Sequence, residues 1–434
     1  MKIINFLKIP MKVSSLILMG SLLSACGSDS ESEVTTTPDP VDDPGSIVTP
    51  DPDVDLCAQE VPGVNWQALL TENCESLSDY NLFSDAGDPT QNPSERGIPY
   101  DLSTPLFTDY ATKYRFVFVP EGETASYSAN EVMEFPVGSV LVKTFSMPQN
   151  TANRGVNETN IETRLLIHRE SGWIALPYYW ETQSDAKFIV TGKTIADVNI
   201  IHNDEEMTFD YAVPLASQCT ACHSVVPIRQ DENDVRPSIF KPIGPKARFL
   251  NNEYEYTNHT MNQLAHWEDQ GILTGAPADK STISSAPVFK DSTDITALSS
   301  DDLNLTARAY LDINCAHCHR SELTIPEEHY NGAAGDSGLR VEFNRDFEED
   351  PAKFGVCKTA VAGGSDKDEN GDVIYPRDVI PARADKSYLL FRMNTTEARH
   401  KMPELGRSSI HSEGVKLIEA WINAMPANDC GLIL

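Results

Sequence analysis

Between residues 57 and 205 the chain contains short runs rich in apolar and aromatic residues, which is the pattern of β-strands. Turn signals such as Pro120-Glu121-Gly122 and Ser171-Gly172 separate these runs. Because strands joined by short turns pair antiparallel, we expect an antiparallel sheet or sandwich. The predicted strands are Tyr114–Val119, Val137–Thr144, Arg164–His168, Trp173–Trp180 and Phe188–Val190.

The C-terminal part has apolar residues at helical spacing instead. Residues 303–314 predict a helix that runs directly into a cysteine motif, and Glu413–Met425 predict another, which Ser412 can cap and Pro426 ends. A short helix is also expected within Asn258–Trp267. The apolar stripes of the two longer helices consist of Leu305, Ala309, Tyr310 and Ile313, and of Val415, Ile418, Trp421 and Ile422.

The N-terminus carries a targeting signal. Lysines precede an apolar run, Val13–Leu23, that is too short to span a bilayer comfortably. The following Leu23-Ser24-Ala25-Cys26 resembles the lipobox of bacterial lipoproteins, which implies removal of residues 1–25 and acylation of Cys26. Because Gly27 is not the aspartate of inner-membrane retention, we expect an outer-membrane lipoprotein facing the periplasm or the cell surface. The alternative is a chance Leu-x-x-Cys in a plain signal peptide or membrane anchor.

The composition of the chain predicts a tether near the N-terminus and argues against a nucleic-acid partner. Residues 26–56 contain Pro, Asp, Ser and Thr but almost nothing that could form a core, so we expect a disordered acidic tether. Over the whole chain, 65 acidic residues against 34 basic ones leave a net charge of -31. Such a surface repels nucleic acid, so no nucleic-acid partner is expected.

The chain has nine cysteines, and an exported protein must allocate them. Cys26 takes the lipid, and two C-x-x-C-H motifs take four more. The even remainder suggests two disulfides, for which we favour Cys57 with Cys74 and Cys357 with Cys430. Four cysteines allow three pairings, so the connectivity is an inference.

The two C-x-x-C-H motifs are the strongest chemical signal in the sequence. They place Cys219 and Cys222 before His223, and Cys315 and Cys318 before His319. In c-type cytochromes the two cysteines form thioethers with haem and the histidine binds the iron, so we predict two covalent haems c. A four-cysteine zinc site or thioredoxin-like redox pairs are the rivals, but neither requires a histidine after each second cysteine. His317, inside the second motif, is expected on an exposed turn without a catalytic role.

Residues 300–430 resemble a class I cytochrome c domain. A helix precedes the haem motif, another lies near the C-terminus, and Arg399–Gly406 resembles the Met-Pro segment whose thioether binds the iron opposite the histidine. The resemblance makes Met402 the sixth ligand of the second haem. Met393 is the alternative, although its neighbours Leu389, Leu390 and Phe391 favour a packed core position. His/Met ligation raises the reduction potential relative to His/His.

The distal side of the first haem is less well defined, because no Met-Pro segment follows His223 before the second domain. We favour His266 as its ligand, then Met261, with His259 as a third candidate. An open site that binds peroxide or another small ligand is the alternative. Phe135–Lys143 faintly resembles a segment of cytochrome P460 proteins, where a lysine cross-links to haem, but the likeness is short and we assign Lys143 to a structural strand.

The order of these features is similar to that of a family of bacterial dihaem c-type cytochromes of unassigned function, which accompany parallel β-helix proteins. The resemblance implies a periplasmic or surface redox partner, among which a parallel β-helix protein is a candidate. The expected fold is α+β and multidomain, with an antiparallel β-rich domain followed by two mostly α-helical, cytochrome c-like haem domains. The expected boundaries are 1–25 (signal peptide), 26–56 (tether), 57–205 (β-rich domain), 206–285 (first haem region) and 286–434 (second haem domain).

Three functions compete at this point. The first is electron transfer between a donor and an acceptor, which needs no substrate pocket. The second is a dihaem peroxidase or related oxidase, in which one haem feeds electrons to another with a labile ligand. The third is a protein that binds a partner or a glycan through its β domain and carries the haems as a redox module.

Overall fold

The computed structural model describes residues 54–432 apart from 232, 322, 326–327, 362–365, 368, 370 and 372. The predicted signal peptide, the lipidation site Cys26 and nearly all of the tether lie outside this range. Within it, no helix combines the length and the apolar character needed to cross a membrane. Contacts group Asp55–Leu434 into one compact unit.

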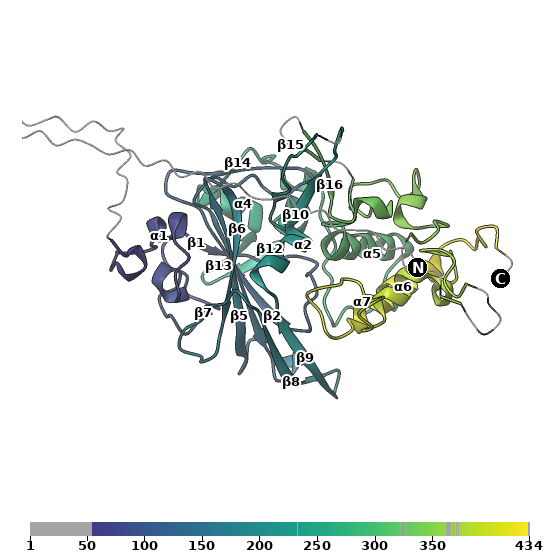
Figure 1. Cartoon of the computed structure of the whole chain (residues 1–434), viewed down its shortest axis with the longest axis horizontal. Coiled ribbons are helices and arrows are strands. Elements are labelled where there is room, and N and C mark those ends of the chain that lie inside the picture. Colours follow the sequence, from purple (N-terminus) through teal and green to yellow (C-terminus); the bar gives the residue numbers. More distant parts are fainter. Residues whose placement is uncertain are drawn as a thin grey trace, which may run out of the picture. The chain divides into compact units, whose positions relative to one another are not determined.

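A six-stranded antiparallel sheet organises the first half of this unit (Figure 1). Four of the predicted strands are present in it, but of the predicted strand Phe188–Val190 only Phe188 is in a strand. The hairpin β8–β9 forms a separate two-stranded ribbon. In order across the sheet, the strands are β1 (Gly97–Pro99), β2 (Thr112–Phe118), β4 (Val140–Met147), β5 (Thr159–Arg169), β6 (Gly172–Tyr179) and β7 (Lys187–Phe188). The ribbon consists of β8 (Lys193–His202) and β9 (Glu205–Val213).

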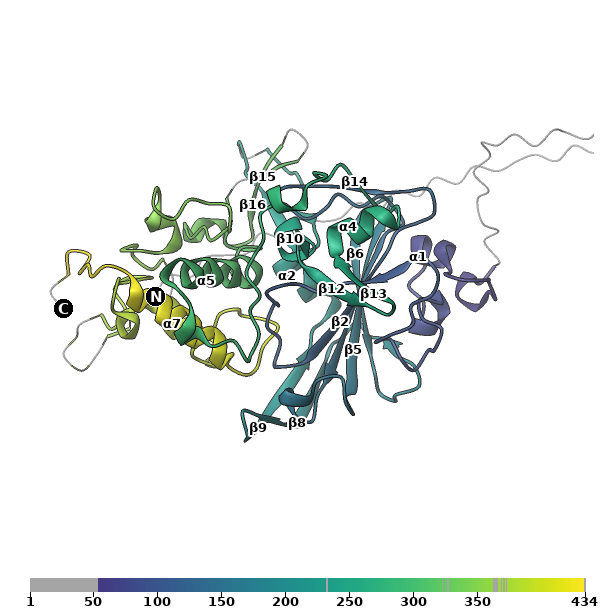
Figure 2. The ribbon, with the colours of Figure 1, turned by 180° about the vertical axis from the view of Figure 1, so that it is seen from behind.

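Both faces of the sheet are buried, each under a different segment. On one face, Phe116, Val142 and Leu165 pack beneath α1 (Trp66–Thr71) and the segment that the Cys57–Cys74 disulfide closes. On the other, Val117 and Leu141 pack against residues that follow the first haem motif (Figure 2). These residues come from α3 (Ala247–Leu250), the hairpin β12 (Glu253–Tyr256) with β13 (His259–Asn262), and α4 (Gln263–Asp269).

The C-terminal part contains the two predicted long helices. They are α5 (Ser300–Cys315) and α7 (Ser412–Ala424), which contact each other and enclose a core with α6 (Tyr388–Met393). The Cys357–Cys430 disulfide joins the end of the chain to a preceding loop, so both predicted disulfides are confirmed.

A small sheet explains how the two haem motifs come together. Its order is β11-β10-β16-β15, where β10 (Ser224–Pro227) begins directly after the first motif. β16 (Glu328–Gly332) follows the second motif and pairs antiparallel with β10. The outer strands of this small sheet are β11 (Ile239–Phe240) and β15 (Leu323–Ile325). A separate parallel pair consists of β3 (Ala125–Ser126) and β14 (Leu273–Thr274).

The predicted fold class is wrong in one respect. Among the described residues strand accounts for 26% and helix for 23%, so the regions of the two C-x-x-C-H motifs are not two mostly α-helical cytochrome c-like domains. Residues 206–285 contain only short helices besides strands and loops. The physical reason is that their large apolar side chains, such as Phe249 and Trp267, complete the core on one face of the six-stranded sheet rather than forming a helical core of their own.

Candidate functional site

The first motif lies on a short helix, α2 (Cys219–His223), just after β9. The His223 ring stacks on Phe240, with centroids 4.9 Å apart, and its Nδ1 hydrogen-bonds the Lys241 carbonyl oxygen at 2.8 Å. That bond fixes the ring and leaves Nε2 for a metal, as in most metal-binding histidines. Burial lowers the pKa of His223 to about 3, which keeps the imidazole in the neutral form that ligation requires.

The second motif follows the end of α5. The His319 amide donates to the Cys315 carbonyl oxygen at 2.9 Å, which folds the C-x-x-C-H segment into a helical turn. His319 Nδ1 hydrogen-bonds the Ser337 hydroxyl at 2.9 Å, so its Nε2 is also left for a metal. Burial lowers the pKa of His319 to about 4. The two motif histidines therefore share two features: a hydrogen bond at Nδ1 that leaves Nε2 for a metal, and a pKa lowered by burial.

A cavity of about 490 Å³ opens beside the second motif. Cys315, Cys318 and His319 line it, and so do Met402 and Met393. The rest of its wall is largely apolar and includes Leu311, Leu339, Val341, Leu389 and Val415. This volume and this lining, with few polar groups, are those of a cofactor site, and the residues therefore fit a thioether-bound haem.

The loop that carries Met402 is held in place by buried charges. The Arg407 guanidinium donates to the carbonyl oxygens of Met402 and Arg392, and the Asp109 carboxylate accepts from the Ser409 amide at 2.7 Å. Met393, by contrast, belongs to the packed face of α6. Both methionine side chains reach the cavity, and only Met402 comes from a loop that polar contacts fix from outside the core.

A smaller cavity, of about 130 Å³, lies beside the first motif and shares several of its lining residues with the larger cavity. Cys219, Cys222 and His223 line it together with residues on the inner face of the sheet. Among these are Lys143 on β4 and Arg164 on β5. Burial, with Arg164 and Arg115 close by, lowers the pKa of Lys143 well below its ordinary value and favours an uncharged amine.

Sequence reasoning gave Lys143 no part in the site, although a signal was present. In β4 the side chains of Leu141 and Lys143 lie on the same side, because side chains alternate along a strand. Leu141 belongs to the core of that face. A lysine in phase with inward-facing residues is unusual and indicates a special environment.

The structure does not bring His266 to the first motif, and the same holds for Met261 and His259. His266 lies on α4, with its ring 3.7 Å from the ring of Tyr256 and its Nδ1 3.4 Å from His259 Nε2. The described residues that line either cavity include none of these three. A short helix was predicted within Asn258–Trp267, but α4 begins only at Gln263 and His259–Asn262 form strand β13. The neighbouring Trp267 turns into the core beside Tyr100 and fixes α4 on the sheet.

The two motifs touch each other. The Cys318 thiol donates to the Ala221 carbonyl oxygen at 3.5 Å, and ligand atoms of Cys222, His317 and Cys318 lie within 4.8 Å of one another. His317 lines both cavities, and its Nδ1 is buried without a hydrogen-bond partner among the described residues. The expected exposed turn is therefore a contact between the two sites.

This contact also tests the zinc alternative. Cys222, His317 and Cys318 could hold a metal ion, but Cys219 and Cys315 are not in that group, so a four-cysteine zinc site is not formed. His223 and His319 also lie apart from it, each oriented by its own hydrogen bond.

Comparison of the chain with models of protein families, with curated proteins and with solved structures found no match.

Proposed function

We propose that the chain is a dihaem c-type cytochrome that transfers single electrons. One observation supports it above the others: two C-x-x-C-H motifs, 96 residues apart in the sequence by the numbers of Cys222 and Cys318, meet at those cysteines, and each borders a cavity. Because each of these sulfurs would carry a haem edge, electrons would need to cross only a short distance between the haems.

In this proposal each residue has a defined part. Cys219 and Cys222 hold the first haem and Cys315 and Cys318 the second, while His223 and His319 bind the irons through Nε2. Met402 is the sixth ligand of the second haem. The haem supplies reversible one-electron chemistry, and the chain sets its potential through axial ligands and burial.

The location and the partner are part of the same proposal. Acylated Cys26 and the acidic tether of residues 26–56 would attach the protein to the outer membrane, facing the periplasm or the cell surface. The partner would be a periplasmic or surface redox protein, for which a parallel β-helix protein is one candidate. A net charge of -31 opposes binding to nucleic acid.

Haem stoichiometry tests this function. Full-length protein made in a host that attaches haem c is expected to contain two irons per chain, with a pyridine haemochrome spectrum of two thioether haems. Cys219→Ala with Cys222→Ala should leave one haem, and so should Cys315→Ala with Cys318→Ala. Zinc in place of iron, or no covalent haem, would overturn the proposal.

One observation favours a second function, a peroxidase-like reaction at the first haem. The described residues lining the first cavity include no methionine, and His223 and His317 are their only histidines. Lys143 and Arg164 are present instead, which suits a site where a small ligand binds iron and is polarised by cationic or donor groups. Cyanide or peroxide is then expected to change the spectrum of one haem of the two, and low-spin spectra unaffected by either would exclude this function.

The same geometry predicts which substitutions change the first haem. Lys143→Met should shift its Soret band and its affinity for cyanide, because the cavity loses the Lys143 amine. His266→Gln should leave both unchanged, since His266 lies on α4 away from either cavity. Optical titration with cyanide measures the two variants side by side, and an effect of His266→Gln with none of Lys143→Met would reverse the assignment.

A further inference from the structure

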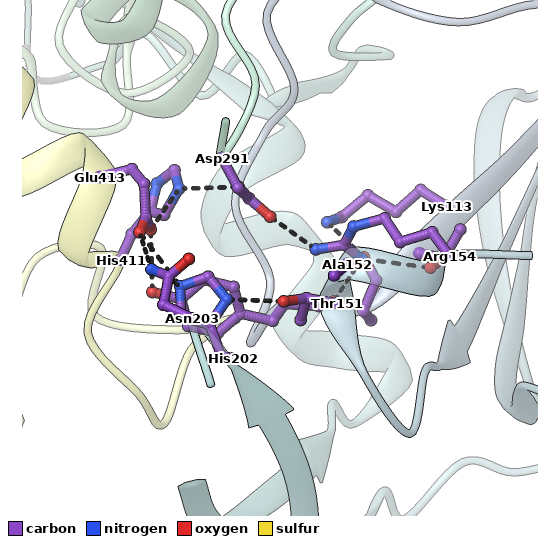
Figure 3. Close-up of polar contacts among 12 residues, drawn as sticks. Lys113, Thr151, Ala152, Arg154, His202, Asn203, Asp291, His411 and Glu413 are labelled. Carbon is purple, nitrogen blue, oxygen red and sulfur yellow. Dashed lines mark hydrogen bonds and ion pairs between the residues drawn. The ribbon is translucent and has the colours of Figure 1, made fainter. Parts of the chain in front are cut away.

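A buried polar cluster adjoins the cavity of the second motif (Figure 3). His411 and Glu413 come from the start of α7, His202 from the end of β8, and Asp291 from the loop before α5. His202, His411 and Glu413 are buried, with exposed fractions of 5%, 6% and 5%. The electron-transfer function described above uses none of these groups.

His411 is the member of this cluster that reaches the cavity. Its Nδ1 hydrogen-bonds the Tyr310 hydroxyl at 2.9 Å, and Tyr310 lines the same cavity. The ring of Phe107 stacks on the imidazole at 4.3 Å. On the other side, His411 Nε2 faces Asp291 Oδ1 at 3.6 Å and Glu413 Oε2 at 3.8 Å, distances too long for hydrogen bonds. The two carboxylates could therefore accept a hydrogen bond from this nitrogen when it is protonated.

Both carboxylates of the cluster already have partners while His411 is neutral. Arg154 pairs with Asp291 Oδ2 at 2.8 Å, and Lys113 lies nearby (Figure 3). Glu413 Oε1 accepts from His202 Nε2 at 3.1 Å, from Asn203 and from Ser412. Tyr110 donates to Glu413 Oε2, and Arg407 faces Tyr310 from the cavity side.

Charge balance decides between two ligands for this site. Asp291, His411 and Glu413 could hold a metal ion by their spacing. A divalent cation would add two positive charges to a buried group whose carboxylates already have cationic and hydrogen-bonding partners, which costs desolvation energy without compensation. A proton adds one charge, and one electron on the adjacent haem offsets it.

We propose that His411 takes up one proton when the second haem is reduced and releases it when that haem is oxidised. The inference rests on the proposed function. The electron comes from the redox partner and goes to the iron, and the proton comes from water to His411 Nε2. The proton reaches buried His411 from solvent by way of Asp291, because the Asp291 side chain is 29% exposed and that of His411 is 7% exposed. Both leave on oxidation, so atoms and electrons balance.

The coupling has a simple electrostatic cause. Burial lowers the pKa of His411, although Asp291 and Glu413 act against that shift, so the site disfavours the imidazolium until another charge compensates it. An added electron in a low-dielectric cavity stabilises the imidazolium and raises its proton affinity. Each tenfold rise in that affinity corresponds to about 59 mV of potential for a one-electron couple.

Potentiometric titration of the haem-loaded protein between about pH 5 and 9, the range around the ordinary histidine pKa of about 6.5, tests the coupling. The midpoint potential of the second haem is expected to fall as pH rises, by up to about 59 mV per pH unit. His411→Gln should remove the slope. His202→Gln, which alters Glu413 from outside the cavity, and His266→Gln, on distant α4, should keep it.

A second variant tests the coupling in case His411→Gln fails to fold. Asp291→Asn changes a partly exposed side chain and removes one carboxylate that would stabilise the imidazolium, so the slope should move to lower pH. Two haems with a potential independent of pH, or a slope that persists in His411→Gln, would overturn the inference alone. Absence of haem from the pyridine haemochrome spectrum would overturn the proposed function as well, and this is seen before any titration.

Discussion

Replacing Asp312 with alanine is expected to lower the free energy of unfolding by about 3 to 5 kcal/mol, because it leaves two buried cations without their counter-charge. Asp312 lies on α5 with an exposed fraction of 1%, and contacts Lys246 Nζ at 3.1 Å and Arg248 Nη1 at 2.9 Å. This triad joins the helix of the second motif to α3, which packs on the sheet. Denaturant unfolding of the full chain measures the change.

Asp301→Ala is the matched control, because Asp301 lies exposed in the first turn of the same helix. Its loss should cost less than about 1 kcal/mol, the usual value of a carboxylate at a helix N-terminus. Equal effects of the two substitutions would contradict the assigned role of the triad.

The same triad gives the protein an acid-sensitive component of stability. Burial alone would raise the pKa of Asp312, but Lys246 and Arg248 hold it below the ordinary value. A carboxyl whose pKa is lower in the folded state stabilises that state above the unfolded pKa of about 3.9. This stabilisation is lost as pH falls through the folded pKa, and it should be absent from Asp312→Ala.

Replacing Met402 with leucine is expected to abolish the near-infrared band of His/Met ligation and to lower the potential of the second haem, because the thioether sulfur is lost from the iron. Met393→Leu is the control: it makes the same, nearly volume-conserving change at the other methionine of the cavity. That variant should keep the band. A band that survives in Met402→Leu and disappears in Met393→Leu would make Met393 the ligand.

Local patterns carried most of the correct predictions about the fold. Short apolar and aromatic runs predicted β2, β4, β5 and β6, and apolar residues at helical spacing predicted α5 and α7. Such patterns depend only on residues close together in the sequence. The disulfides followed from counting cysteines in a chain predicted to be exported. The helical-domain prediction failed because nothing local in residues 206–285 says that Phe249 and Trp267 pack on strands more than a hundred residues earlier.

The site divides in the same way. Motif spacing predicted the cysteines and histidines as site residues, and the Met-Pro segment predicted Met402; all of them line one of the two cavities. His266 does lie on a helix, α4, but the sequence could not tell that its face with Trp267 packs on the sheet and leaves His266 outside the first cavity. The meeting of Cys222 with Cys318 depends on the pairing of β10 with β16, a long-range register that short sequence patterns do not encode.

That pairing has a consequence for biogenesis. Gly332, on β16, lies so close to the Cys318 carbonyl oxygen that a Cβ would collide with it, so the strands dock tightly behind the two motifs. Before haem is attached, the thiols of Cys222 and Cys318 lie within 4.8 Å in the folded chain. An oxidising compartment that closes Cys57 with Cys74 can also join these two, and such a bond would remove one attachment point from each haem. In the proposed cytochrome, attachment of haem before β10 and β16 dock would prevent this bond, and we expect maturation to follow that order.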